Sequence, residues 1–162
     1  MYGTIWAALI LFAAGEAGKR REARWAWWSW LAGVLLLAVH ITMAMAIVHG
    51  WSHAAAIAAT AGATNAIFGV DWGGGVYANY LFLIVWAAEI AWWRTSPSSY
   101  ARRSAAATWW LRIFYFVMIT NAAVIFVPNW RRWLGVAIVA TVLLSWRASG
   151  PEPGAPSPEP RA

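Results

Sequence analysis

Long apolar stretches alternate with short polar loops along this chain. The stretches cover residues 2–15, 25–48, 76–93, 105–127 and 133–147, and Trp residues gather at several of their ends. Trp favours the boundary between hydrocarbon and lipid headgroups, because its ring is apolar while its N–H needs a polar partner. The pattern therefore predicts an all-α, polytopic membrane bundle of five transmembrane helices, forming a single domain over residues 1–147.

The first and last apolar stretches are short, since a helix needs about 20 apolar residues to cross the hydrocarbon core. A bundle of four helices is the alternative, with one of these stretches lying only in the membrane interface. In the long outer loop, residues 54–66 predict a short interfacial helix, which the glycines at 69 and 73–75 would end. Beyond Arg147, glycine and five prolines predict a disordered tail over residues 148–162.

The start of the fourth helix carries its own signal. Ser96 followed by Pro97 is typical of a helix N-terminus. We expect the helix to run from there through Arg102 and Arg103 and across the membrane to Val127, where Pro128 would stop it.

Composition agrees with a membrane protein. Of the 162 residues, 62% are hydrophobic and only 11% are charged, against about a quarter in soluble domains. The chain has no cysteine, which excludes disulfides, iron–sulfur clusters and cysteine nucleophiles. We find no nucleophile–base arrangement, so the sequence favours a protein that is not an enzyme.

Basic residues set the predicted orientation. An outer N-terminus leaves only Arg131 and Arg132 outside. The other loop and tail cations then lie inside: Lys19, Arg20, Arg21, Arg24, Arg94, Arg102, Arg103, Arg147 and Arg161. The positive-inside rule thus predicts a cytoplasmic-membrane protein with its C-terminus in the cytoplasm. Because these cations sit beside apolar runs, we expect contacts with anionic lipids at the inner face and no binding of nucleic acid.

Two charged residues interrupt the apolar stretches near the inner edge. From the helical rise, Glu89 lies about 6 Å deep and Arg112 about 10 Å deep. An unpaired charge is costly in hydrocarbon, so we expect the two to pair across the third and fourth helices. Such a pair would lock these helices together. The alternatives are a proton or ion site built on Glu89, or two separate charges that reach the interface.

A second polar layer is predicted nearer the outer side. His40 lies about 22 Å from the inner edge, with Asn79 and Asn121 at similar depths and Thr120 close by. These side chains could form an interhelical hydrogen-bond cluster. Arg112 and Asn121 are nine residues apart and point to opposite faces of a helix, so both cannot meet the same neighbour.

Histidines give the one motif-like feature. His49 and His53 are four residues apart, which on a helix places both imidazoles on one side, and Asp71 could add an oxygen ligand. We predict no cofactor. A divalent metal or haem held by His40, His49 or His53 is the alternative, although only His40 lies well inside a span.

The sequence thus favours a non-catalytic membrane subunit or scaffold that packs against partner helices, either of other subunits or of a second copy. A small transporter or channel protomer that uses Glu89 as its coupling carboxylate is the alternative. A metal- or haem-binding membrane protein is the second alternative.

Overall fold

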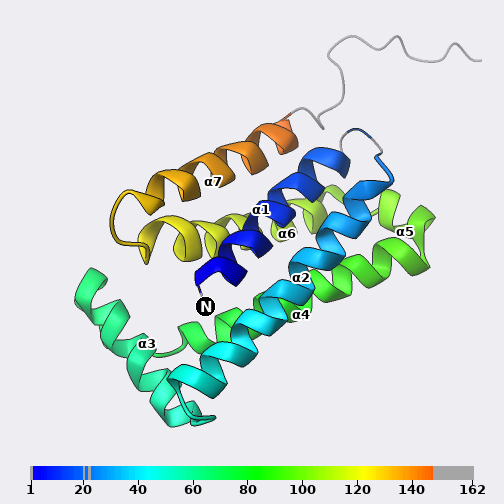
Figure 1. The fold of residues 1–162 in the computed structure, drawn as a ribbon. Coiled ribbons are helices and arrows are strands. Elements are labelled where there is room, and N and C mark those ends of the chain that lie inside the picture. Colours follow the sequence, from blue (N-terminus) through cyan, green and yellow to red (C-terminus); the bar gives the residue numbers. More distant parts are fainter. Residues whose placement is uncertain (1, 20, 22, 148–162) are drawn as a thin grey trace, which may run out of the picture.

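The computed structural model describes residues 2–19, 21 and 23–147, and every regular element within them is helical. Five helices lie side by side (Figure 1): α1 (Tyr2–Lys19), α2 (Trp25–Met43), α4 (Gly75–Thr95), α6 (Ala105–Thr120) and α7 (Arg131–Arg147). Two π-helical turns, η1 (Ala44–Val48) and η2 (Asn121–Ile125), continue α2 and α6. The predicted tail, residues 148–162, lies outside the described residues.

Contacts between the five helices form a closed ring. Going round it, α1 contacts α2, α2 contacts α4, α4 contacts α6, α6 contacts α7, and α7 returns to α1. The helix α3 (His53–Phe68) leans on α4 at one end of this bundle, and the short α5 (Pro97–Ala101) links α4 to α6 at the other (Figure 1). We call these ends of the bundle the α3 end and the α5 end.

Three of the helices are long and apolar enough to cross a membrane. They span Trp25–Val48, Gly75–Thr95 and Ala105–Ile125. Many large apolar side chains on the bundle are exposed, among them Trp28, Trp110 and Trp133 at 65%, 72% and 70%. The surface of a soluble protein rarely carries so many large exposed apolar side chains, so the predicted membrane character is supported. The predicted all-helical fold is confirmed for the described residues.

The connection between α4 and α6 differs from the predicted continuous helix. Pro97 does begin a helix, but α5 ends at Ala101, and α6 starts afresh after Ser104. The Ser104 hydroxyl accepts a hydrogen bond from the Ala107 N–H and thereby caps the new helix. The Arg103 side chain turns back and donates to the Tyr100 carbonyl oxygen, 3.1 Å away. These local bonds replace the helical ones that a continuous helix would have made.

An aromatic cluster fills the centre of the bundle. Phe12 of α1 stacks on Trp30 of α2 with ring centroids 5.2 Å apart, and it meets Trp86 of α4 and Tyr115 of α6 edge to face at 4.9 Å and 5.0 Å. Trp30 and Trp86 are fully buried. Edge-to-face and offset rings at these distances attract one another beyond their burial. The cluster thus joins α1 to three other helices, α2, α4 and α6.

Two glycines let the helices approach this cluster closely. A methyl group on Gly15 of α1 would overlap the Trp30 indole, and one on Gly33 of α2 would come 2.7 Å from the Trp86 ring. Because both indoles are fully buried, neither can move aside cheaply. Gly33 belongs to the face of α2 that also carries His40, and the structure places this face toward α1 and α4.

Candidate functional site

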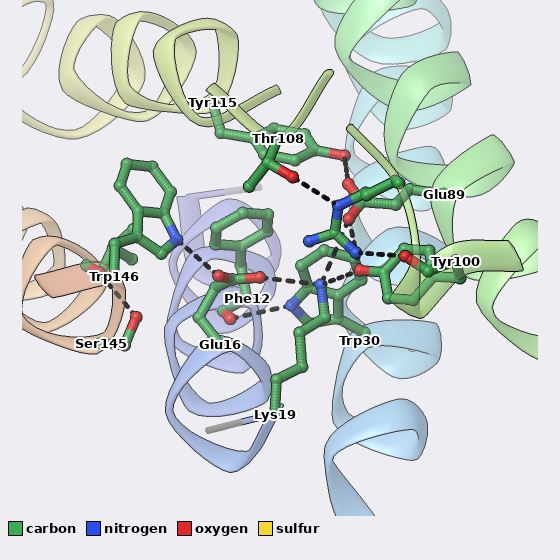
Figure 2. A network of polar contacts seen from close by, with 12 residues as sticks. Phe12, Glu16, Lys19, Trp30, Glu89, Tyr100, Thr108, Tyr115, Ser145 and Trp146 are labelled. Carbon is green, nitrogen blue, oxygen red and sulfur yellow. Dashed lines mark hydrogen bonds and ion pairs between the residues drawn. The ribbon is translucent and has the colours of Figure 1, made fainter. Parts of the chain in front are cut away.

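A buried carboxylate, Glu89, lies near the end of α4, with its side chain only 5% exposed. The Tyr100 hydroxyl of α5 donates a hydrogen bond to Oε1, and the Tyr115 hydroxyl of α6 donates one to Oε2. Each donor–acceptor distance is 2.6 Å. Lys19 Nζ of α1 lies 3.4 Å from Oε1. Three other elements, α1, α5 and α6, thus hold this carboxylate (Figure 2). Hydrogen bonds to an ionised acceptor are stronger than those between neutral groups.

Lys19 is the last residue of α1, and its ammonium group reaches into the bundle. It lies 3.0 Å from Glu16 Oε1 and donates to the Tyr100 hydroxyl oxygen at 2.9 Å. The same nitrogen sits 3.0 Å from the centroid of the Trp30 ring. Two carboxylates, a hydroxyl oxygen and an aromatic face thus replace the water that this ammonium loses on burial.

Glu16 extends the network to the last helix. Its Oε1 faces Lys19, and its Oε2 accepts a hydrogen bond of 2.6 Å from the Trp146 indole N–H of α7. Figure 2 shows the Glu16 carboxylate between the lysine and the indole. Through Glu16 and Glu89 together, one connected set of bonds reaches α1, α4, α5, α6 and α7, which we call the carboxylate network.

Tyr100 ties the short helix α5 to this network. Its ring stacks on the Trp93 ring, with the ring centroids 5.8 Å apart. The Arg103 guanidinium lies 4.2 Å from the centroid of the Tyr100 ring. Burial of the hydroxyl and the neighbouring Glu89 charge raise the pKa of Tyr100 well above its usual range. The hydroxyl therefore keeps its proton at physiological pH and acts as a donor to Glu89.

A cavity of about 160 Å³ adjoins the network. Three cations line it, Lys19, Arg103 and Arg112, together with the carboxylates of Glu16 and Glu89. Helices α1, α4, α6 and α7 all contribute to its wall. A cavity needs only about 10–15 Å³ of such volume to hold one water, so this space accommodates several waters or a small polar group.

The cation that contacts Glu89 is Lys19 and not the predicted Arg112. Arg112 lines the same cavity, but its guanidinium lies 5.8 Å from the Trp109 ring and 5.6 Å from the Trp146 ring. The prediction paired residues of similar depth on neighbouring helices. It failed because the side of α6 that faces Glu89 carries Tyr115, whose hydroxyl fills that position.

The predicted outer polar cluster is not assembled in the structure. His40 Nδ1 lies 3.0 Å from the Thr4 hydroxyl of α1, while Asn79 is exposed on α4. Thr120 ends α6 with a buried hydroxyl that has no hydrogen-bond partner within the described residues, and Asn121 begins the π-helical turn η2. His40 pairs with Thr4 of α1, so similar depth did not bring it together with the polar residues of α4 and α6.

The residues predicted as metal ligands do not converge either. The His53 ring packs edge to face on Tyr80 at 5.7 Å, and Asp71 accepts a hydrogen bond from the Asn65 side chain at 2.9 Å. Within residues 2–19, 21 and 23–147, no group of three His, Asp or Glu side chains is placed to hold a metal ion. His49 precedes the turn at Gly50 and Trp51, so the helix that would have aligned it with His53 starts only at His53.

Among the members of the carboxylate network, the apolar pattern predicts only Glu89 as a buried polar residue. Glu16 and Lys19 fall in a predicted loop, because the apolar stretch stops before them. Their spacing of three residues, typical of a helical ion pair, was the available signal that α1 continues to Lys19. Tyr100, Tyr115 and Trp146 carry no distinguishing signal in a chain so rich in aromatic residues.

Comparisons of the chain with models of protein families, with curated proteins and with solved structures found no match. Its function is therefore inferred from its own residues.

We predict that Tyr115→Phe destabilises the bundle by about 1.5–3 kcal/mol, because it removes a hydroxyl bonded to a charged carboxylate and keeps the ring in place. Tyr77→Phe is the matched control, since its side chain is 59% exposed on the same bundle. Thermal unfolding in a mild detergent measures both variants. Equal melting temperatures for the two would contradict the role given to the Tyr115 hydroxyl.

Proposed function

We propose that this chain is a non-catalytic subunit or scaffold of the cytoplasmic membrane, with five spans that pack against partner helices. The observation that carries the proposal is the full engagement of its buried carboxylate. Both oxygens of Glu89 are bonded, to tyrosine hydroxyls and a lysine from three other elements. A carboxylate held in this way acts as a structural tie, and the bundle exposes large apolar side chains suited to lipid and to partner helices.

Five spans are supported by the way α1 and α7 complete the ring of helices. They have 18 and 17 residues, which at about 1.5 Å per residue approaches the hydrocarbon thickness of about 30 Å. Both helices also contribute to the carboxylate network. Alternating directions then put the chain termini on opposite sides of the bilayer.

The distribution of Lys and Arg between the two ends of the bundle supports an N-terminus outside the cell. The α5 end of the bundle carries Lys19, Arg24, Arg94, Arg102 and Arg147, whereas Arg131 and Arg132 lie at the α3 end. Under the positive-inside rule the α5 end faces the cytoplasm, where its cations meet anionic lipids.

Cysteine labelling tests this topology, because the natural chain has no cysteine. We expect single cysteines at Gly3, Gly62 and Pro128 to react with a membrane-impermeant maleimide in intact spheroplasts. Cysteines at Ala101 and Ala162 should react only after permeabilisation. Protection of Gly3→Cys in intact spheroplasts, or labelling of Ala162→Cys there, would contradict five spans in this orientation.

A transporter role is the second candidate, and one observation favours it. Glu89 lines the cavity of about 160 Å³ beside Lys19, where water could meet a membrane carboxylate. Proton-coupled transporters use such groups.

Glu89→Gln separates the two roles. A structural tie predicts a loss of about 1–3 kcal/mol of stability, since Lys19 keeps only Glu16 as a carboxylate partner. It also predicts that the natural protein, in liposomes carrying a potassium-driven potential, moves protons no faster than empty liposomes do. Proton flux in the natural protein that the folded Glu89→Gln variant abolishes would overturn the structural role and establish transport.

A further inference from the structure

The charges around the cavity do not balance. Lys19, Arg103 and Arg112 face only two carboxylates, so with both carboxylates ionised the site carries one excess positive charge. A positive charge that is partly removed from water is costly unless an anion neutralises it. The cavity therefore has the charge of a site for one monoanion.

Both carboxylates are already committed to other groups. Glu16 faces Lys19 and the Trp146 N–H, and Glu89 faces Lys19 and two tyrosine hydroxyls. Lys19 forms salt bridges with both of these carboxylates. The excess charge thus belongs to Arg103 and Arg112.

Arg112 is placed as an anion ligand. The aromatic rings of Trp109 and Trp146 flank its guanidinium group, which makes no hydrogen bond in the described part of the chain. Its N–H groups form a planar fork that matches two oxygens of a phosphate.

Arg103 supplies a second, more rigid cation. Its Nε donates a hydrogen bond to the Thr108 hydroxyl oxygen, and one terminal nitrogen donates one to the Tyr100 carbonyl oxygen, each at a distance of 3.1 Å. Its guanidinium also packs on the Tyr100 ring. These contacts fix the group and leave its other terminal nitrogen without a hydrogen bond to the described residues, so little conformational entropy is lost when it binds an anion.

We propose that this cavity binds a monoanionic phosphate group between Arg103 and Arg112. A phosphodiester carries one negative charge and therefore matches the excess charge of the site. Two sources share this chemistry: the headgroup of an anionic lipid and free phosphate. The lipid source rests on the proposed cytoplasmic placement of the α5 end, which would put the cavity near the anionic headgroups of the inner leaflet.

The test uses the full-length protein in phosphatidylcholine nanodiscs. One arm adds phosphatidylglycerol and measures the bound lipids by native mass spectrometry. The other titrates inorganic phosphate by calorimetry. The variants are Arg103→Gln and Arg112→Gln, and the matched control is Arg132→Gln, which removes an equal charge from an exposed residue at the α3 end, outside the cavity. Thermal unfolding checks that every variant is folded.

We expect each cavity variant to weaken binding about tenfold or more, as loss of a charge-assisted hydrogen bond predicts, and the control to leave it unchanged. Selective retention of phosphatidylglycerol identifies a lipid headgroup, and binding of inorganic phosphate alone identifies a soluble anion. If Arg112→Gln does not fold, Arg112→Lys replaces it, with weakened binding expected from loss of the fork.

Two results would overturn the proposal: the natural protein binds neither phosphatidylglycerol nor inorganic phosphate, or Arg132→Gln loses as much binding as the cavity variants do. Neither depends on the scaffold role, whose own failure would appear as proton flux through the natural protein.

Discussion

A carboxylate inside an apolar helix bundle must be compensated, and this requirement organises the structure. Leaving such a charge without partners costs several kcal/mol, so Glu89 of α4 is stable only when donors from other elements reach it. Lys19, Tyr100 and Tyr115 supply them from α1, α5 and α6. Each donor must be held at a fixed depth and rotation, so the carboxylate specifies how these helices are arranged.

The rest of the fold is consistent with this constraint. Lys19 reaches Glu89 because α1 continues to that residue and lies against α2, where Gly15 admits the Trp30 indole beneath the ammonium group. The aromatic cluster around Phe12 holds α1 in the bundle, and Glu16 links it to α7 through Trp146. The helix α1, whose apolar stretch is short, thus connects to three other elements of the carboxylate network, α4, α5 and α7.

Apolar periodicity and Trp placement were sufficient to predict a helical membrane bundle, and an isolated carboxylate in an apolar run was sufficient to single out Glu89. Its partners could not be predicted, because a partner depends on helix rotation and on where each helix ends. Similar depth suggested Arg112, but the α6 face toward Glu89 carries Tyr115. For the same reason His40 meets Thr4 of α1, and not the polar residues of α4 and α6.

A double-mutant cycle on Lys19 and Glu89 tests the central claim that this ion pair ties α1 to α4. Lys19→Met, Glu89→Gln and the double variant are unfolded in mild detergent and their free energies of unfolding compared. The account predicts that each single variant is destabilised and that the pair is coupled by at least about 1 kcal/mol, as for residues in one charge network. Effects that add to within about 0.3–0.5 kcal/mol would contradict it.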